Sequence, residues 1–221
     1  LTRPMWFALD YFYKFLGNYG LAIIAVTVCI RIVLFPLAQI SFKSMSRMKL
    51  LAPEMKRIKE VNKDDKKKIQ QEMMALYKKE KVNPMSGCLP IIPMVFIFFS
   101  LYKVLFVTLD GRHKPFYGYL KDLSERDPTS VFNLFGLINW TPPDFLLIGC
   151  LPILFGISMF AQQKMNPAPP DPVQAKIFMF FPLFLTIVLA PFPSGLVLYW
   201  LTNNCLQMIQ QYIVIRQTKV K

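Results

Sequence analysis

Charged side chains are nearly absent from five long stretches of this 221-residue chain, and their absence excludes a water-exposed surface for those stretches. Each stretch is close in length to the ~20 mostly apolar residues that a helix needs to cross a bilayer. The whole chain is 54% hydrophobic. We therefore predict an all-α integral membrane protein with five transmembrane helices, at residues 15–40, 88–109, 144–162, 174–192 and 194–215.

Side chains suited to metal binding or catalysis are scarce. Histidine occurs once, as His113, and the chain contains no HExxH or GxSxG motif and no pair of aspartates within a span. The four cysteines form no CxxC pair and lie in or beside apolar stretches, where packing roles are usual; they are Cys29, Cys88, Cys150 and Cys205. We expect no metal site, no disulfide and no enzymatic activity.

Positive charge is abundant, and it is unevenly distributed. Of the lysines and arginines, 13 lie in residues 43–82, two in 164–176 and three in 216–221, a total of 18, against six in the connections of the other side. Because basic loops remain in the cytoplasm, we predict an outer N-terminus and a cytoplasmic C-terminus. An outer N-terminus requires a leader or an earlier span, so we expect the sequence, which begins at Leu1, to be a fragment.

These assignments divide the chain into eight segments. In order they are an outer interfacial segment with the first span (1–42), a cytoplasmic basic helical hairpin (43–82), the second span (83–109), an outer loop (110–143), the third span (144–163), a proline-rich cytoplasmic loop (164–173), the fourth span (174–193), and the fifth span with a basic tail (194–221). The last two spans are joined by very few residues, which predicts a tight hairpin. We expect Lys103 to extend from the second span to the outer interface.

The basic segment 43–82 has apolar residues at three- and four-residue spacing on both sides of a polar turn, which predicts two amphipathic helices in an antiparallel hairpin. Pro53 should kink or interrupt the first helix, and an aspartate of the turn 61–65 (Asp64 or Asp65) should cap the second. The segment holds 13 basic and six acidic residues. Two interpretations stay open: a solvated pair of helices beside anionic headgroups, or a docking surface for an anionic partner such as ribosomal RNA or a targeting factor.

Arg31 is the only charged residue in the stretch 15–40. An ionisable side chain within a span by default marks a functional site that faces water or a partner. Thr27 precedes Arg31 by one helical turn and shares its face. No aspartate or glutamate lies at a comparable depth in any span to neutralise the guanidinium, so it needs water, carbonyl groups or a passing anion.

The last span carries a polar stripe at three- and four-residue spacing, made of Tyr199, Asn203, Gln207 and Gln210 or Gln211. Such a stripe is costly in lipid, so it should face the interior of the bundle. It could hold helices together through interhelical hydrogen bonds. Together with Arg31, it favours instead a hydrophilic groove that is open to the cytoplasm.

Several segments have distinctive sequences: GNYGLAII and CIRIVLFPL in residues 17–37, DDKKKIQQEMMALYKKEKVNPMSGCLP in 64–90, DLSERDPT in 122–129, and FPSGLVLYWLTNNCLQMIQQ in 192–211. They closely resemble the core of the YidC-type bacterial membrane protein insertases, a family that mitochondria and chloroplasts share. The resemblance covers nearly the whole chain. It implies a protein of the bacterial cytoplasmic (inner) membrane that inserts and helps to fold new membrane proteins without ATP or another cofactor.

The resemblance also implies partners. These are nascent membrane proteins, the ribosome, the Sec translocon and the lipid bilayer. The family works either alone or beside the Sec translocon. The signal recognition particle or its receptor is a further candidate. We assign contact with the ribosome or another partner to five basic residues of the hairpin and one acidic residue of the second cytoplasmic loop. They are Lys56, Arg57, Lys59, Lys66, Lys67 and Asp171.

Arg31 matches the arginine of the family's substrate groove, and Trp200 stands where a tyrosine is common. The groove residues we predict are Arg31, Thr27, Tyr199, Trp200, Asn203, Gln207 and Gln211. Phe98 and Phe99 are the residues along which we expect a substrate span to slide into lipid. Two other classes of function remain as rivals: a small-anion transporter or channel in which Arg31 binds the ion, and an assembly scaffold in which the stripe docks partner helices.

Overall fold

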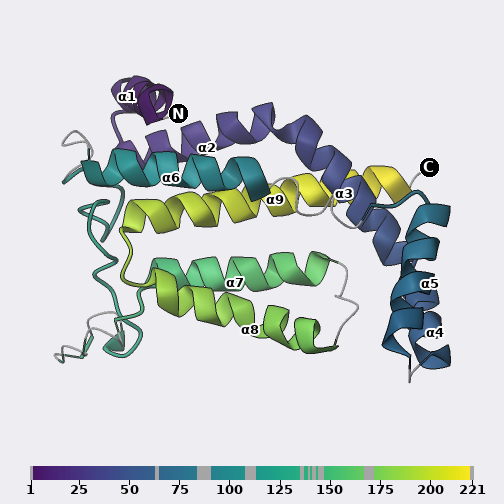
Figure 1. The fold of residues 1–221 in the computed structure, drawn as a ribbon. Coiled ribbons are helices and arrows are strands. Elements are labelled where there is room, and N and C mark those ends of the chain that lie inside the picture. The colour runs from purple at the N-terminus through teal and green to yellow at the C-terminus, as the bar shows by residue number, and fades with distance from the viewer. Residues whose placement is uncertain are drawn as a thin grey trace.

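The structure is a computed structural model that describes residues 2–62, 65–83, 91–107, 113–134, 137–138, 140, 143, 147–166 and 172–219. The regular secondary structure of these residues is entirely α-helical, apart from one isolated β-bridge between Arg126 and Pro193. The helices are α1 (Thr2–Leu16), α2 (Tyr19–Val33), α3 (Phe35–Leu50), α4 (Ala52–Val61), α5 (Lys66–Lys79), α6 (Ile91–Val107), α7 (Cys150–Met165), α8 (Pro172–Leu189) and α9 (Ser194–Lys219) (Figure 1).

The long helix α9 is the centre of the bundle. It packs against α2, α3, α6 and α7, while α1 lies across α2 and α6 (Figure 1). The helix α8 packs against α7 and makes little contact with α9. The last two spans are joined by a short connection, as predicted, but they do not pack against each other as a hairpin would. The helix α7 lies beside α9 instead.

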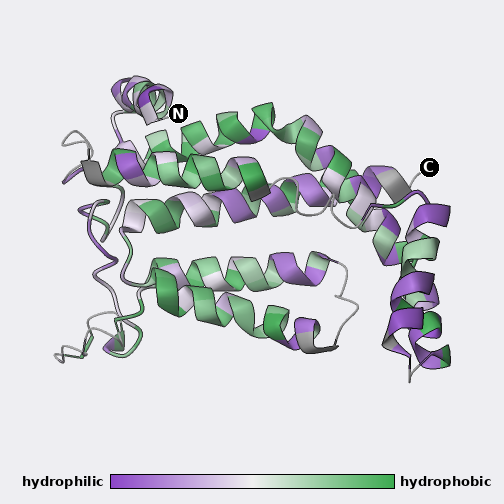
Figure 2. Cartoon of the chain, viewed as in Figure 1, coloured by the Kyte–Doolittle hydropathy of each residue, from purple (hydrophilic) through white to green (hydrophobic). Residues whose placement is uncertain are grey.

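Close backbone approach explains the pairing of α7 with α8. A Cβ atom added to Gly156 of α7 would collide with Oγ1 of Thr186 on α8, and the Thr186 hydroxyl donates to the carbonyl of Pro182 within its own helix at 2.8 Å. In lipid, helices associate through close packing of small residues, because burial of apolar side chains gives little net driving force. From Ile177 to Val188 the exposed side chains of α8 are apolar (Figure 2).

The first predicted span is bent. No single helix in the described ranges is both long and apolar enough to cross a membrane; α2 and α3 meet these length and hydropathy criteria only as a pair, with a bend of 66° between them. Pro36 stands in the first turn of α3, where its missing N–H costs little because the first N–H groups of a helix have no partner within the helix. The prediction of one helix over 15–40 is corrected to two, because the break falls at Leu34.

Capping groups also move helix starts away from the predicted boundaries. α2 begins at Tyr19, because the side chain of Asn18 accepts a hydrogen bond from the backbone N–H of Leu21 at 3.1 Å. α7 begins at Cys150, later than the predicted residue 144. Hydropathy alone does not locate these ends, because they depend on hydrogen bonds.

The basic segment forms two paired helices at the far end of the bundle (Figure 1). The chain leaves α3 at Leu51, and Pro53 stands in the first turn of α4, as its sequence position predicts. The Asp65 carboxylate accepts from the backbone N–H groups of Lys67 and Lys68 at 3.0 and 3.1 Å, which confirms the predicted cap. The apolar cluster between α4 and α5 consists of Met55, Met73 and Leu76.

The main core lies toward the opposite end of the bundle, where α1, α2, α6, α7 and α9 meet. Its fully buried side chains include Leu9, Ile23, Leu101, Phe155, Leu196 and Val197. The polar side chains of α2 and α9 begin where this apolar cluster ends. The core therefore fixes the relative position of the two helices that carry the candidate site.

Candidate functional site

Arg31 lies in the last turn of α2 and is only 5% exposed. Its Nε donates to Oδ1 of Asn203 at 2.7 Å, and its Nη2 donates to Oε1 of Gln207 at 2.9 Å. Nη2 also donates to the backbone carbonyl of Asn203 at 3.1 Å. Asn203 and Gln207 are one turn apart on α9, so one face of that helix binds two of the three guanidinium nitrogens.

Neighbouring groups complete this polar cluster. The Nε2 of Gln210 donates to the backbone carbonyl of Arg31 at 3.2 Å, which satisfies a carbonyl close to the end of α2, where partners within the helix run out. The sulfur of Met94 on α6 lies 3.9 Å from both Nη2 of Arg31 and Nδ2 of Asn203. α2, α6 and α9 therefore all contribute to the cluster.

Neutral dipoles, not an acid, surround the guanidinium. Two ion pairs in the described part of the chain, Lys14 with Asp10 and His113 with Asp122, do not include Arg31. A buried cation without a carboxylate is costly unless carbonyls, water or an anion replace its hydration. The nitrogen Nη1 of Arg31, which carries two further donors, bonds to neither Asn203 nor Gln207 in the described part of the chain.

The structure brings some predicted groove residues to Arg31 and separates others. Thr27 is 2% exposed, and its hydroxyl donates to the carbonyl of Ile23 at 2.6 Å within α2, not to the cluster. Tyr199 is 4% exposed and lies about one turn before Asn203 on α9. The predicted group thus contains an inner set of direct contacts, with Thr27 and Tyr199 beside it.

Gln211 lies on a different side of α9 from the cluster, and its grouping with Arg31 is corrected. Its Nε2 donates to Oδ1 of Asn166 at 3.0 Å, at the end of α7. At ~100° per residue, position 210 is about 20° from Asn203 around the helix, whereas position 211 is about 80° away. Gln210 is therefore the residue that continues the stripe.

The side chain of Trp200 faces α6 and α7 and does not face Arg31. Its ring packs edge-on against Phe98 of α6 at 5.4 Å and against Phe155 of α7 at 5.5 Å between centroids. Its Nε1–H is buried and has no hydrogen-bond partner in the described part of the chain. Phe99, next to Phe98, is 58% exposed on the surface of α6.

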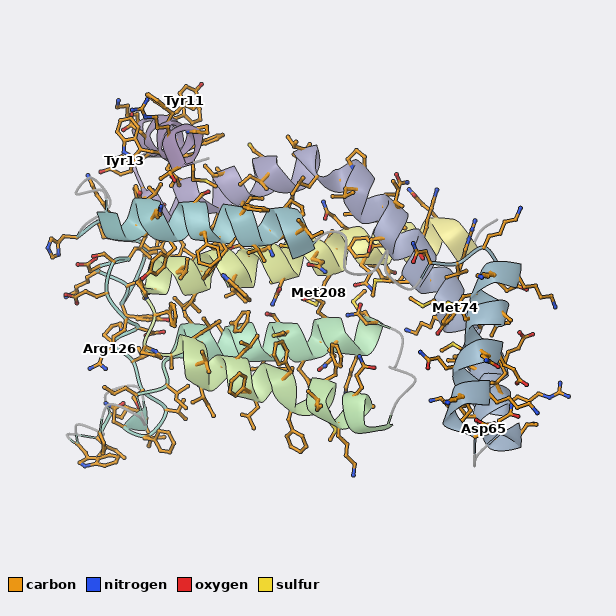
Figure 3. All side chains as sticks on the ribbon, in the orientation of Figure 1. Tyr11, Tyr13, Asp65, Met74, Arg126 and Met208 are labelled. Carbon is orange, nitrogen blue, oxygen red and sulfur yellow. The ribbon has the colours of Figure 1, made fainter. Side chains whose placement is uncertain are left out.

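Five of the predicted partner-contact residues belong to the paired helices α4 and α5, at the opposite end of the bundle from the main core. Lys56, Arg57 and Lys67 are exposed, and Lys59 is half-buried. Lys66 begins α5, but its side chain is outside the described residues, as is all of Asp171. Figure 3 shows Asp65 at this end of the molecule and Arg126 at the other.

The segment 113–134 contains a capping motif that the sequence analysis did not identify. Asp127 is 4% exposed, and its Oδ2 accepts from the backbone N–H of Leu151 at 2.8 Å. Oγ1 of Thr129 accepts from the backbone N–H of Cys150 at 2.8 Å. Asp-Pro-Thr preceding an apolar stretch is the signal that could have revealed this cap, but 20 residues separate it from the helix it caps.

The same segment also holds the start of α9. The backbone N–H groups of Ser194 and Gly195 donate to the carbonyls of Glu125 and Leu123 at 2.7 and 2.9 Å. The N-termini of α7 and α9 are thus attached to one segment, which sets the spacing between the two helices at this end.

Comparisons with known proteins place the chain in a family. The family model described as "60Kd inner membrane protein" matches residues 11–221. Proteins named membrane protein insertase YidC are 70% identical in Pelagibacter ubique, across 100% of this chain and 40% of that protein, and 53% identical in Brucella suis, across 100% and 36%. The chain therefore spans well under half the length of these relatives.

A solved structure shows the same fold. It is described as an active YidC insertase with its first transmembrane domain resolved, and it matches with a TM-score of 0.68 at 22% identity, over 96% of this chain and 45% of that one. The chain belongs to the 60Kd inner membrane protein family, the family of the YidC membrane protein insertases.

Proposed function

We propose that this chain is the insertase core of a bacterial inner-membrane protein, and that it transfers newly made membrane segments into lipid without chemical catalysis. The named relatives support the insertase role. The observation that carries our proposal for its mechanism is the buried guanidinium of Arg31. Asn203 and Gln207 hold it, and no carboxylate of the described residues forms an ion pair with it.

In this mechanism Arg31 binds the polar segment of a client. The donors of Nη1 are the ones that Asn203 and Gln207 leave available. A carboxylate or a backbone carbonyl of the client would accept them, and a charged acceptor would bind more strongly. Because neutral amides hold Arg31, the incoming group replaces no existing ion pair. Five transmembrane helices surround a hydrophilic groove that opens to the cytoplasm.

Such a groove would lower the main barrier to insertion. Moving a charged side chain to the centre of a bilayer costs at least ~2.5–3.5 kcal/mol. A polar cluster within the membrane shortens the apolar distance that the client's polar segment must cross. The client's apolar span then passes the aromatic surface of Phe98 and Phe99 into lipid, while partitioning and, for acidic segments, the membrane potential supply the driving force.

The paired helices α4 and α5 would receive clients from the ribosome on the cytoplasmic side. Their exposed basic side chains, such as Lys56 and Arg57, suit an RNA surface. Placing them in the cytoplasm puts the start of α1 on the outer side and the end of α9 in the cytoplasm. The Sec translocon and the signal recognition particle or its receptor are the further partners that we propose.

The test is insertion of a single-span client with an acidic tail into proteoliposomes. We expect Arg31→Ala to lose most insertion and Arg31→Lys to retain part of it, since lysine keeps the charge but loses the planar fork. Arg3→Ala, an exposed arginine of α1, is the matched control and should insert normally. Equal loss in both Arg31 variants would oppose a role of charge.

Two further measurements separate this proposal from its rivals. Anion flux through liposomes that contain no client peptide would favour a small-anion transporter, because a buried cation can bind a free anion as well. Crosslinking of stalled nascent chains to cysteines placed at Thr27, Asn203 and Gln207 would favour the insertase. A scaffold would crosslink only to folded partner helices.

A further inference from the structure

A small cavity lies at the end of the bundle opposite α4 and α5, where the proposed mechanism has no use for it. Its volume is about 110 Å³. α1 supplies four of its lining residues, α2 one and the segment 113–134 one; they are Trp6, Leu9, Asp10, Tyr13, Tyr19 and Lys114. Three aromatic rings, one carboxylate and one ammonium therefore surround a single space.

The cavity already binds an alkylammonium group. Nζ of Lys114 lies 4.3 Å from the centroid of the Tyr13 ring and donates to its hydroxyl at 3.0 Å. The face of a tyrosine ring attracts an ammonium group through the ring quadrupole. The Asp10 carboxylate accepts from Lys14 at 2.7 Å, but that lysine side chain is 74% exposed. An exposed pair at this spacing is weak, so Asp10 can exchange Lys14 for another cation.

The surface of α1 indicates where the cavity lies in the membrane. Phe7, Tyr11 and Phe15 follow one another at four-residue spacing and are 62%, 68% and 78% exposed. Figure 3 shows Tyr11 on the side of α1 that points away from the bundle and Tyr13 nearer to it. A helix with one packed face and one exposed aromatic face lies at the level of the lipid headgroups, so the cavity lies at that level too.

We propose that this cavity binds the headgroup of phosphatidylethanolamine. The primary ammonium would donate to Asp10 against the aromatic rings, and Lys114 would turn to the phosphate. A cavity of ~150 Å³ holds benzene, which has six heavy atoms, so 110 Å³ suits the three heavy atoms of an ethanolamine arm better than the six of a choline arm. The inference relies on the placement of α1 at the membrane surface that the proposed function includes.

Native mass spectrometry of the purified full chain in detergent tests this inference. The protein is titrated with short-chain phosphatidylethanolamine, phosphatidylcholine and phosphatidylglycerol. We expect phosphatidylethanolamine to bind about tenfold more tightly than the other two, the scale of one hydrogen bond to a charged group. Equal binding of the three lipids, or tighter binding of phosphatidylglycerol, would overturn the proposal.

Variants test the two assigned contacts. Asp10→Asn should abolish the preference for the primary amine over choline, and Lys114→Ala should weaken binding of all three phosphates. Lys121→Ala and Glu125→Gln, exposed residues of the same segment, are matched controls and should bind as the parent does. A preference that survives Asp10→Asn would overturn the assignment. If a variant fails to fold, the three-lipid comparison on the parent chain still decides. No client is present, so the result is independent of insertion activity.

Discussion

Asn203 holds Arg31 through both its side chain and its main chain. Nε of Arg31 donates to the side-chain oxygen at 2.7 Å, and Nη2 donates to the backbone carbonyl at 3.1 Å. A substitution at this position keeps the carbonyl and removes only the amide. The neighbouring Asn204 points to α7, where its Nδ2 lies 3.4 Å from Oγ of Ser158. Asn203 and Asn204 are both 8% exposed, so they form a matched pair.

We expect Asn203→Leu to reduce insertion of an acidic-tailed client about tenfold or more, because a hydrogen bond to a charged group contributes ~1.5–3 kcal/mol. Asn204→Leu should reduce insertion much less, since its bond joins two neutral groups and is long. The measurement is the yield of protease-protected client in proteoliposomes, with the amount of folded variant held equal. Equal loss in the two variants would mean that the stripe acts as interhelical glue.

The cap of α7 by Asp127 should be measurable in stability. Asp127→Ala removes an acceptor of the Leu151 N–H and leaves a helix end unsatisfied, which costs ~0.5–2 kcal/mol for capping residues. We expect a lower unfolding temperature in detergent and faster amide hydrogen exchange in the first turn of α7. Thr129→Ser keeps a hydroxyl beside Cys150 and serves as the control. Unchanged exchange at Leu151 in the Asp127 variant would contradict the cap.

Stability of the segment 113–134 should fall in acid. Burial alone would raise the pKa of Asp122, but hydrogen bonds from Ser124 and from His113 outweigh burial, so the pKa of this carboxyl lies below its usual range. Because the pKa in the folded state is depressed, Asp122 contributes stability above its unfolded pKa, roughly 3.9, and that contribution is lost as pH falls through the folded value.

Hydrogen exchange of this segment between roughly pH 2 and pH 5 is the measurement. We expect protection in the parent to decline at the acidic end, and Asp122→Asn to show a smaller change, since an amide does not titrate. Glu125→Gln alters an exposed acid of the same segment and should keep the parent's profile. A steep acid decline in Asp122→Asn would assign the effect to another group.

The basic surface of α4 should determine ribosome binding. Reversing two exposed charges with Lys56→Glu and Arg57→Glu should weaken cosedimentation with ribosomes several-fold, and the remaining binding should depend less on salt, because fewer counterions are released. The control is Lys14→Glu, an exposed lysine on α1. Unchanged binding in the double variant would favour the interpretation in which the basic residues only lie beside anionic headgroups.

Gln210 and Gln211 show how far sequence reasoning reached at the site. Spacing in the sequence placed polar side chains on α9 and predicted that they face inward. The choice between neighbouring positions depends on the rotation of α9 about its axis, which is set by its packing against α2 and α7. Met94 carries no polar periodicity, and nothing in the sequence indicated that it lies beside Arg31.

The sequence by itself determined the helical class, the apolar stretches, the basic insertion and the residue types around Arg31, because hydropathy and charge act locally along the chain. The tertiary structure alone decided that α7 separates α8 from α9, that α2 and α3 meet at 66°, and that Asp127 caps a helix 24 residues further along. These features depend on close packing and hydrogen bonds between distant segments. Their energies depend on three-dimensional position, which residue spacing does not encode.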